Sequence, residues 1–371
     1  MKIGLLGFGT VGKGVYDIVA QRPDMAVSQV LCRRELTLDD AKVTHSMQTI
    51  LEDESIDTVV EVMGGLHPAY EYVRDAMASG KHVITANKAL VATHYEELLA
   101  LAEKHGVCLR ATAAVGGGIG WLSELERARR VQRITALHGI VNGTCNYILD
   151  AMTRLNLDYP QVLTQAQALG YAEADPTTDV EGTDSWHKLL LSANIAFGIH
   201  LQPESVPVCG ISQISGEDIA NFTAHGRVCK LMACAEEDEA TYHAYVHPVL
   251  VPVGEPEAAV PENYNHITLV GSLTGKQSLF GQGAGRYPTA YNVVQDCVDV
   301  LAGHGFYAPL GRQAQADNSK VCQFYVRGCR DAWLDANTQT HWGNAIITRP
   351  VSIREMHSWK QAHPQAFLAQ L

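Results

Sequence analysis

Residues 1–12 read MKIGLLGFGTVG, in which an apolar run leads into the glycine pattern GxGxxG. This order predicts a strand over residues 2–6 and a helix over residues 11–20, with the glycines in the turn between them. There the glycines permit a tight turn, a close approach of a pyrophosphate to the backbone, and close packing of the helix on the strand. The stretch therefore predicts a dinucleotide site at the helix N-terminus, with a glycine turn of purely structural use as the alternative. The predicted contact residues are Gly7, Phe8, Gly9, Thr10, Val11 and Gly12.

Strand-like and helical patterns continue to alternate after this opening. The further predicted strands are residues 27–32, 58–62, 82–85 and 107–111, and the further predicted helices are residues 68–79 and 94–105. Repeated alternation of this kind predicts a parallel sheet with helices on both faces. We therefore expect an α/β, Rossmann-type, doubly wound nucleotide-binding domain.

A different pattern begins near residue 134, after the glycines at 116–118. A strand over 134–140, helices to about residue 198 and strand-like runs over 242–280 predict an α+β domain, with a hairpin turn near 273–276. Residues 251–263 read as a surface loop. Near the C-terminus, residues 321–326 and 344–348 read as strands and residues 353–370 as a helix. The predicted division is a first domain over 1–133 that is completed by about 284–315, a second domain over 134–283, and a short C-terminal β/α appendage over 316–371.

Composition narrows the class of protein. The 371 residues include 28 basic and 40 acidic side chains, for a formal net charge of −12 with no long basic run, so we expect no nucleic-acid partner. No stretch approaches the length of a membrane span, and the glycine-rich start does not resemble a secretory leader. The nine cysteines are scattered, odd in number and without a CxxC pair, which indicates reduced thiols. These features together predict an unsecreted cytoplasmic protein with no membrane partner.

The end of the second predicted strand bears on the choice of dinucleotide. An NAD site usually places an acidic residue there to bind the ribose, whereas this chain has Arg33 and Arg34 followed by Glu35. Arginines at this place favour the 2′-phosphate of NADP. NAD remains the alternative, because Glu35 could still reach a ribose and paired arginines are often only solvated charge.

Residues 170–188, GYAEADPTTDVEGTDSWHK, gather five acidic side chains and end at a lysine before the apolar run LLLSANIAFG. On a helix, Asp184 and Lys188 share one face, and the apolar run indicates that the helix enters a core. A partly desolvated lysine held by a carboxylate is a candidate for acid-base chemistry. The alternative is an ordinary exposed ion pair at positions i and i+4.

Seven motifs in one order resemble the homoserine dehydrogenase family over residues 1 to about 310. They are GFGTVG (7–12), VVEVMGG (59–65), ITANKAL (84–90), VGGGI (115–119), GIVNGTCNYIL (139–149), the segment 170–188, and GQGAGRYPTA (281–290). The resemblance implies NAD(P)-linked interconversion of L-homoserine and L-aspartate 4-semialdehyde, a step toward threonine and methionine. It also implies a homodimer, with substrate binding and dimerisation in the second domain.

The resemblance carries roles for individual residues. Lys188 would be the proton donor, Asp184 its orienting carboxylate, and Lys88 a third catalytic residue that also lies near the cofactor. The implied substrate-binding residues are Glu173, Asp179, Thr144, Tyr171 and Asp184, and further implied cofactor contacts are Gly64, Thr85, Lys88 and Gly283. Glu173 would bind the α-ammonium group of the amino acid. From the residues alone, the Asn142 to Thr144 stretch could be only a strand-end turn, and Gly283 could be only the end of a glycine-rich hairpin.

The chain also departs from the family pattern. Thr112 replaces the glutamate associated with a monovalent-cation site, so we expect a sodium-like site only as a weak one built from the carbonyls of Val115, Gly117 and Ile119. Gly120, followed by Trp121, replaces a proline. The family's C-terminal regulatory module would not fit after about residue 318, so regulation by threonine is not expected.

Two other functions fit the same residues. One is a related NADP-dependent reductase of another small amino-acid aldehyde or keto acid, because the departures at Gly120 and Trp121 could alter the pocket. The other is a non-catalytic NADP-binding regulatory protein. The acidic segment that ends at Lys188 opposes the second possibility, because burying charges without a use is costly.

Overall fold

The computed structural model describes residues 1–239, 241–305 and 311–371. Contacts divide the chain into two compact units, which we call the first unit and the second unit. The first unit comprises Met1–Val131, Asn194–His200 and Gly281–Arg312, and the second comprises Gln132–Ala193, Leu201–Phe280 and Gln313–Leu371. The C-terminal residues therefore belong to the second unit and do not form a unit of their own.

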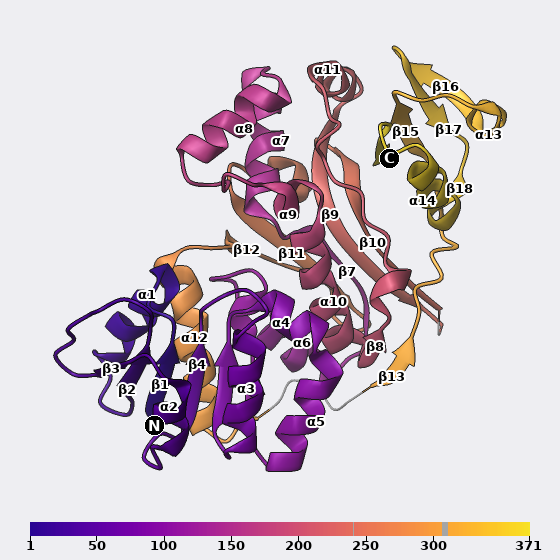
Figure 1. Ribbon diagram of the computed structural model, residues 1–371. Helices are drawn as coiled ribbons and strands as arrows, with labels where there is room; N and C mark the ends of the chain where they lie inside the picture. Colours follow the sequence, from indigo (N-terminus) through magenta and orange to yellow (C-terminus); the bar gives the residue numbers. More distant parts are fainter. Residues whose placement is uncertain (240, 306–310) are drawn as a thin grey trace. The chain divides into compact units, whose positions relative to one another are not determined.

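The first unit is built on a six-stranded parallel sheet (Figure 1). Its strands are β1 (Lys2–Leu6), β2 (Ala26–Leu31), β3 (Lys42–Thr44), β4 (Thr58–Glu61), β5 (His82–Thr85) and β6 (Leu109–Arg110). They lie in the order β3-β2-β1-β4-β5-β6, so the chain starts near the centre and builds outward in both directions. This is the doubly wound order of a Rossmann-type domain, which confirms the predicted fold class.

Helices cover both faces of this sheet (Figure 1). They are α1 (Thr10–Val19), α2 (Met47–Glu52), α3 (Ala69–Ala78), α4 (Lys88–Thr93), α5 (Tyr95–His105), α6 (Trp121–Arg129), α12 (Arg286–Leu301) and the 3₁₀ turn η1 (Thr112–Ala114). Helix α1 packs against α12, while α3 packs against α2 and α5. Right-handed crossovers between parallel strands place these two groups on opposite faces. The core between the sheet and the α1/α12 pair contains the buried residues Ile3, Val15 and Val293.

The second unit contains a mixed sheet of nine strands in the order β12-β11-β7-β9-β10-β19-β15-β17-β16. These strands are β7 (Ile134–Ile140), β9 (Arg227–Asp238), β10 (Thr241–Pro252), β11 (Tyr264–Gly271), β12 (Gly275–Gln282), β15 (Phe324–Arg327), β16 (Thr338–Trp342), β17 (Ala345–Thr348) and β19 (Phe367–Gln370). Strand β19 pairs in parallel with β10 and antiparallel with β15. Two small sheets pair β8 (Ile199–Leu201) with β13 (Arg312–Ala314), and β14 (Val321–Cys322) with β18 (Val351–Ser352).

The remaining helices surround this sheet. They are α7 (Gly143–Leu155), α8 (Tyr159–Ala168), α9 (Thr177–Val180), α10 (Thr183–Phe197), α11 (Gly216–Ala224), α13 (Ala332–Ala336), α14 (Ile353–Ala362) and the 3₁₀ turns η2 (Pro203–Ser205) and η3 (Pro256–Ala259). Helix α7 packs on β9 and β11 and also against α8. The combination of helices with a largely antiparallel sheet agrees with the predicted α+β class.

The C-terminal segment departs from its predicted structure. The helix expected over 353–370 ends at Ala362, and Phe367–Gln370 instead form β19 inside the nine-stranded sheet. Pro364 lacks a backbone N–H and so breaks the helix, and the buried residues Phe367, Leu368 and Ala369 fit a strand with neighbours on both sides. The loop predicted over 251–263 also contains order, because β10 runs to Pro252 and η3 follows it.

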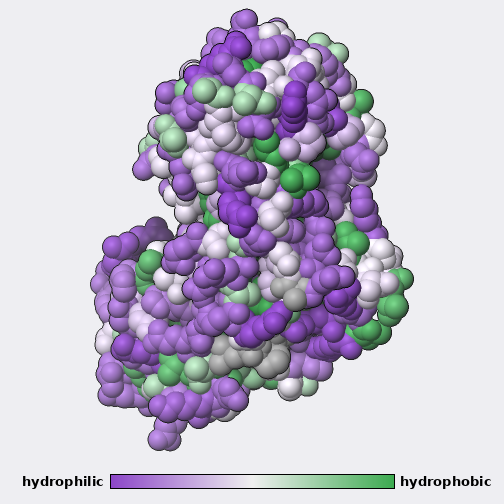
Figure 2. Space-filling model, turned by 90° about the vertical axis from the view of Figure 1, so that its right-hand side faces the viewer, coloured by the Kyte–Doolittle hydropathy of each residue, from purple (hydrophilic) through white to green (hydrophobic). Residues whose placement is uncertain are grey.

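The face of the molecule drawn in Figure 2 is mostly hydrophilic, and its hydrophobic residues form small separate patches. Scattered exposed apolar side chains are normal on a protein surface. Within residues 1–239, 241–305 and 311–371, none of the helices has the length and apolar character needed to cross a membrane.

Candidate active site

Asp184 and Lys188 form a buried ion pair on α10. The Lys188 Nζ lies 2.7 Å from Asp184 Oδ2 and donates to the backbone carbonyl of Val141 at 2.6 Å. Asp184 is 4% exposed and Lys188 9% exposed, and the apolar residues 189–191 that follow are buried. The pair is therefore not an exposed surface ion pair, and the second anchor of the ammonium is a backbone carbonyl that the sequence did not indicate.

Asn142 links the acidic side chains of Asp179 and Asp184. Its Nδ2 donates to Asp179 Oδ1 at 2.7 Å and to Asp184 Oδ2 at 2.8 Å, while its Oδ1 accepts from the backbone N–H of Cys145 at 2.8 Å. Asn142 is thus also the N-cap of α7. Burial raises the pKa of Asp179, and the hydrogen bond from Asn142 opposes that rise. Sequence reasoning treated Asn142 as part of a turn, although an asparagine at a helix start is a recognisable capping signal.

The other predicted substrate residues divide into two groups. Thr144 is buried, and its hydroxyl donates to the backbone carbonyl of Tyr171 at 2.6 Å. The ring of Tyr171 packs on Tyr147 with 5.0 Å between the ring centroids. Glu173 is exposed, two residues after Tyr171, and its carboxylate makes no hydrogen bond or ion pair within the part of the chain that the structure describes. The structure therefore brings Thr144, Asp179, Asp184 and Lys188 to one region and leaves Glu173 at its exposed edge.

In the first unit, the glycine-rich turn lies between β1 and α1 as predicted. Gly7 has a φ of 100°, and a Cβ added at Gly12 would lie 2.2 Å from the Gly7 carbonyl oxygen, so both positions require glycine. A Cβ at Gly9 would meet nothing within 4 Å. Open space beside Gly9 at the N-terminus of α1 fits a phosphate-binding turn, where backbone N–H groups and the helix dipole favour an anion. Thr10 and Val11 begin this helix.

Arg33 and Arg34 are exposed after β2. The Arg34 Nη2 donates to the carbonyl of Phe8 at 3.1 Å, so this guanidinium lies over the glycine-rich turn. Glu35 is also exposed, and its Oε1 lies 3.2 Å from the Nε2 of His45. The contact with His45 gives Glu35 a partner other than a ribose.

Glu61 organises the carboxyl ends of β4 and β5, although sequence reasoning gave it no role. Its carboxylate accepts from the backbone N–H groups of Met63 at 2.7 Å and Gly64 at 3.3 Å, and from the Thr85 hydroxyl at 2.6 Å. Burial raises the pKa of Glu61, and these hydrogen bonds oppose the rise. The sequence signal for the role of Glu61 was its position in VVEVMGG, between a buried strand and a pair of glycines.

The contacts around Thr85 continue to the next helix. The Thr85 hydroxyl accepts from the backbone N–H of Asn87 at 2.9 Å, and the Asn87 side chain caps α4 at Leu90. Lys88 is the first residue of α4 and is half-buried. Three predicted cofactor residues, Gly64, Thr85 and Lys88, therefore lie at neighbouring strand ends of one sheet edge, where ligands bind in open α/β sheets.

Comparisons with known proteins agree along most of the chain. Residues 7–111 match the homoserine dehydrogenase NAD-binding domain family, and residues 121–298 match the homoserine dehydrogenase family. The homoserine dehydrogenase of Bacillus subtilis is 39% identical over 330 residues, which cover 83% of this chain and 76% of that protein. That of Synechocystis is 40% identical over 318 residues, which cover 81% and 73%.

The chain belongs to the homoserine dehydrogenase family. A solved structure of a homoserine dehydrogenase from Thiobacillus denitrificans is 31% identical, with a TM-score of 0.88 over 100% of this chain and 98% of that one. The predicted activity follows from membership: the protein is an NAD(P)-dependent oxidoreductase that interconverts L-homoserine and L-aspartate 4-semialdehyde. Its substrate is a small molecule.

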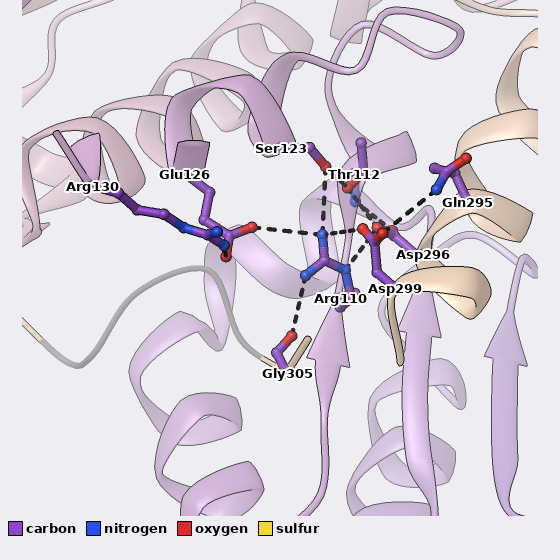
Figure 3. Close-up of polar contacts among 9 residues, drawn as sticks. All are labelled: Arg110, Thr112, Ser123, Glu126, Arg130, Gln295, Asp296, Asp299 and Gly305. Atoms are coloured by element: carbon purple, nitrogen blue, oxygen red, sulfur yellow. Dashed lines mark hydrogen bonds and ion pairs between the residues drawn. The ribbon is translucent and has the colours of Figure 1, made fainter. Parts of the chain in front are cut away.

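At Thr112 the chain departs from the family pattern, and this residue contacts a buried cluster of charged side chains (Figure 3). Asp296 on α12 accepts from the Thr112 hydroxyl at 2.6 Å and from its backbone N–H at 2.8 Å. The fully buried Arg110 places its Nε 3.0 Å from Asp296 Oδ1 and its Nη2 2.8 Å from Asp299 Oδ2. It also contacts Glu126, Ser123 and the carbonyl of Gly305. Burial raises the pKa of Asp296, and the Arg110 charge opposes that rise.

The glycine segment after Thr112 is held by the same helix. Asn292 on α12 donates to the carbonyl of Gly117 at 2.6 Å, and the backbone N–H of Gly118 donates to the carbonyl of Gln282 at 3.0 Å. A Cβ at Gly117 would lie 2.4 Å from the carbonyl oxygen of Gly283, so this approach requires glycine. Gly283 is therefore packed against the segment, and its role as a cofactor contact stays a prediction.

The carbonyl groups of Val115, Gly117 and Ile119, which were predicted to form a weak cation site, lack the charged ligands of a strong one. Val115 and Ile119 are buried and uncharged, and the Gly117 carbonyl already accepts the Asn292 hydrogen bond. Over the described residues, no group of three or more His, Cys, Asp or Glu side chains is placed to hold a metal ion. Gly120 precedes α6, and Trp121 is fully buried at its start.

Proposed function

We propose that Lys188 delivers the proton in the reaction that this family catalyses, with Asp184 as its orienting carboxylate. The observation that carries the proposal is the buried ammonium held by Asp184 Oδ2 and the Val141 carbonyl. An ammonium has three N–H groups, so two such contacts leave one for a substrate oxygen. A bound nicotinamide supplies or accepts the hydride. During reduction, the aldehyde oxygen gains negative charge, which the ammonium stabilises and then protonates.

We infer that the amino-acid part of the substrate is bound by Glu173, Asp179, Thr144 and Tyr171. Glu173 contributes a carboxylate for the α-ammonium group, and its position on an exposed turn suits a side chain that meets the substrate as it enters. Asp179 is oriented by Asn142. Thr144 fixes the backbone at Tyr171 and so positions the start of that turn.

We propose NADP as the preferred cofactor. Arg33 and Arg34 are exposed beyond β2, and Arg34 already lies over the glycine-rich turn through the Phe8 carbonyl. A guanidinium suits a 2′-phosphate because it offers several N–H donors in a planar fork. The turn at Gly7, Gly9 and Gly12 binds the pyrophosphate. Gly64, Thr85, Lys88 and Gly283 serve the nicotinamide end, and Lys88 assists catalysis there.

We also infer a cytoplasmic homodimer. The nine free thiols support a reducing compartment, since none is paired in a disulfide within the described structure. The second unit supplies the dimer interface, as the family resemblance implies. Measuring the molar mass in solution by light scattering tests the dimer, and a monomer at micromolar concentration would refute it.

The Lys188→Ala variant tests the proton donor. We expect kcat for homoserine oxidation, in which Lys188 takes the hydroxyl proton as a general base, to fall roughly 10² to 10⁴-fold, the usual effect of removing a general acid-base group, with the Kd for NADP+ unchanged. Lys276→Ala is the control, because Lys276 is an exposed lysine of the same unit. Turnover near the wild-type value in the Lys188 variant would remove Lys188 from this role.

A steady-state assay of homoserine oxidation with each cofactor tests the NADP preference. We expect the ratio of kcat/KM for NADP+ over NAD+ to exceed one and to fall about tenfold or more in an Arg33→Ala, Arg34→Ala double variant. The KM for NAD+ should stay the same. Equal kcat/KM values for the two cofactors in the wild type would show that the arginines are only solvated charge.

A further inference from the structure

The backbone that follows η3 is fixed along α7 by buried polar contacts. The Asn146 Nδ2 lies 2.7 Å from the carbonyl oxygen of Glu262 and 3.3 Å from that of Val260. The fully buried Lys230 donates to the Val260 carbonyl at 2.7 Å and to Asn146 Oδ1 at 2.8 Å. Burial lowers the pKa of Lys230 to about 8. These contacts determine where the chain enters β11.

A close backbone approach adds to this restraint. A Cβ at Gly143 would lie 2.6 Å from the carbonyl oxygen of Asn263, so the segment 260–264 runs directly against the first turn of α7. The same turn carries Thr144 and follows the cap residue Asn142. The next residue along the chain, Asn265, therefore lies beside the groups that hold Lys188.

Asn265 shares an acceptor with Lys188. Its side chain is fully buried, and its Nδ2 donates at 3.1 Å to the Val141 carbonyl, which also accepts from Lys188 Nζ at 2.6 Å. A carbonyl oxygen has two lone pairs, so both donors are accommodated. The Asn265 hydrogen bond holds the carbonyl in one orientation, and the direction of that carbonyl helps to determine where the Lys188 ammonium lies.

The oxygen of the Asn265 side-chain amide differs from its nitrogen. Its Oδ1 is buried and has no hydrogen-bond partner among the described residues. An unsatisfied buried acceptor costs about 1–3 kcal/mol. A side chain that only filled the core would not carry that cost, so the amide fits a role of its Nδ2 in the site.

We propose that Asn265 is a positioning residue for the reaction: it orients the Val141 carbonyl and thereby holds the Lys188 ammonium in line with the reacting oxygen. The inference rests on the proposed role of Lys188. Lys188 transfers the proton, and Asn265 fixes the position of the Lys188 ammonium without needing to contact the substrate.

The test measures Asn265→Ala for kcat, for the KM of the cofactor and for unfolding in urea. We expect kcat to fall about ten- to hundredfold, because small displacements of a catalytic group have effects of this size. The KM for the cofactor should stay unchanged. Asn318→Ala is the matched control, since among the described residues the buried Asn318 amide bonds only backbone groups of Ser205 and Ala244. That control should lose stability and keep its kcat per folded molecule.

A double variant separates positioning from a structural role. In the Lys188→Ala, Asn265→Ala double variant, kcat should equal that of Lys188→Ala, because Asn265 acts through Lys188.

The outcomes distinguish this inference from the proposed function. If Lys188→Ala is harmless, the proposed function fails. If Lys188→Ala is severe and Asn265→Ala keeps the wild-type kcat, only the positioning role fails. Additive losses in the double variant would also overturn it, because Asn265 would then act independently of Lys188.

Discussion

The two units each contain a buried cation beside a carboxylate, but the two cations are held differently. In the first unit, Arg110 is surrounded by Asp296, Asp299, Glu126 and uncharged acceptors (Figure 3). In the second unit, Lys188 is held by Asp184 and one backbone carbonyl. A guanidinium saturated by protein groups clamps chain segments together, whereas an ammonium with an N–H to spare can serve a substrate. A buried ion pair therefore indicates chemistry only when its cation keeps an N–H group that can bond a substrate.

The largest expected effect comes from a substitution in the charge cluster around Arg110 in the first unit. Arg110→Met should lower the free energy of unfolding by about 3–5 kcal/mol, because it leaves the buried Asp296 without its cation. Urea unfolding measures this loss. Arg127→Met is the control, since the exposed Arg127 pairs with Glu124 and such surface pairs contribute about 0–1 kcal/mol. If the Arg110 variant were as stable as the control, the cluster would not be a clamp.

The corresponding change in the second unit should affect rate more than stability. In Asp184→Asn, the ammonium loses its charged partner, and we expect kcat to fall about 10- to 100-fold with a smaller loss of stability than in Arg110→Met. Steady-state kinetics at saturating substrate measure the change. Asp175→Asn is the control, because Asp175 lies on the same acidic segment but is exposed and, within the described parts of the chain, its carboxylate bonds only Thr177. A normal kcat in Asp184→Asn would place the catalytic charge elsewhere.

A third buried network, without charge, sharpens the comparison. Cys209 Sγ lies 3.4 Å from His357 Nδ1, His357 Nε2 lies 3.1 Å from His247 Nδ1, and His247 Nε2 lies 2.6 Å from Gln370 Oε1. With both imidazoles neutral, hydrogen bonds donated in turn by Cys209, His357 and His247 satisfy all three contacts. Burial lowers the pKa of His247 to about 4 and that of His357 to about 3.

These lowered pKa values predict a loss of stability in acid. In the unfolded chain these imidazoles become protonated below about pH 6.5, whereas in the folded chain they stay neutral down to about pH 4. The free energy of unfolding therefore falls as the pH drops through this window. The expected loss is roughly 2 kcal/mol for each imidazole by pH 4.5. Urea unfolding at pH 7.5 and pH 4.5 measures it, and His247→Gln should reduce the dependence. Equal stability of the wild type at both pH values would contradict the neutral network.

The smallest expected effect concerns cations in solution. The segment after Thr112 is fixed by Asp296 and Asn292, so a bound monovalent ion is not needed to hold it. Replacing Na+ or K+ by a bulky organic cation at equal ionic strength should change kcat less than about twofold. A strong activation by Na+ at fixed ionic strength would restore the carbonyls of Val115, Gly117 and Ile119 as a cation site.

Much of the architecture was predictable from local patterns. Strands β1 and β5 and strand β7 were predicted with the residues that form them, because apolar runs and flanking turn signals are local. The C-terminal strand β19 was mistaken for the end of a helix, because it is a strand only by virtue of pairing with β10 and β15. Asn142, Glu61 and Asn265 were missed as site residues, since a polar side chain acquires its role from partners that are distant in sequence.

The sequence by itself determined that a nucleotide-binding unit precedes a second unit, and that Asp184 and Lys188 share a helix face, because periodicity and i,i+4 spacing are properties of the local chain. Only the tertiary structure decided that this pair is buried and which group completes it. The Val141 carbonyl is 47 residues from Lys188 and 124 residues from Asn265 along the chain. No local pattern encodes contacts over such separations, which arise when the end of β7, the start of β11 and the first turns of α10 pack together in the second unit.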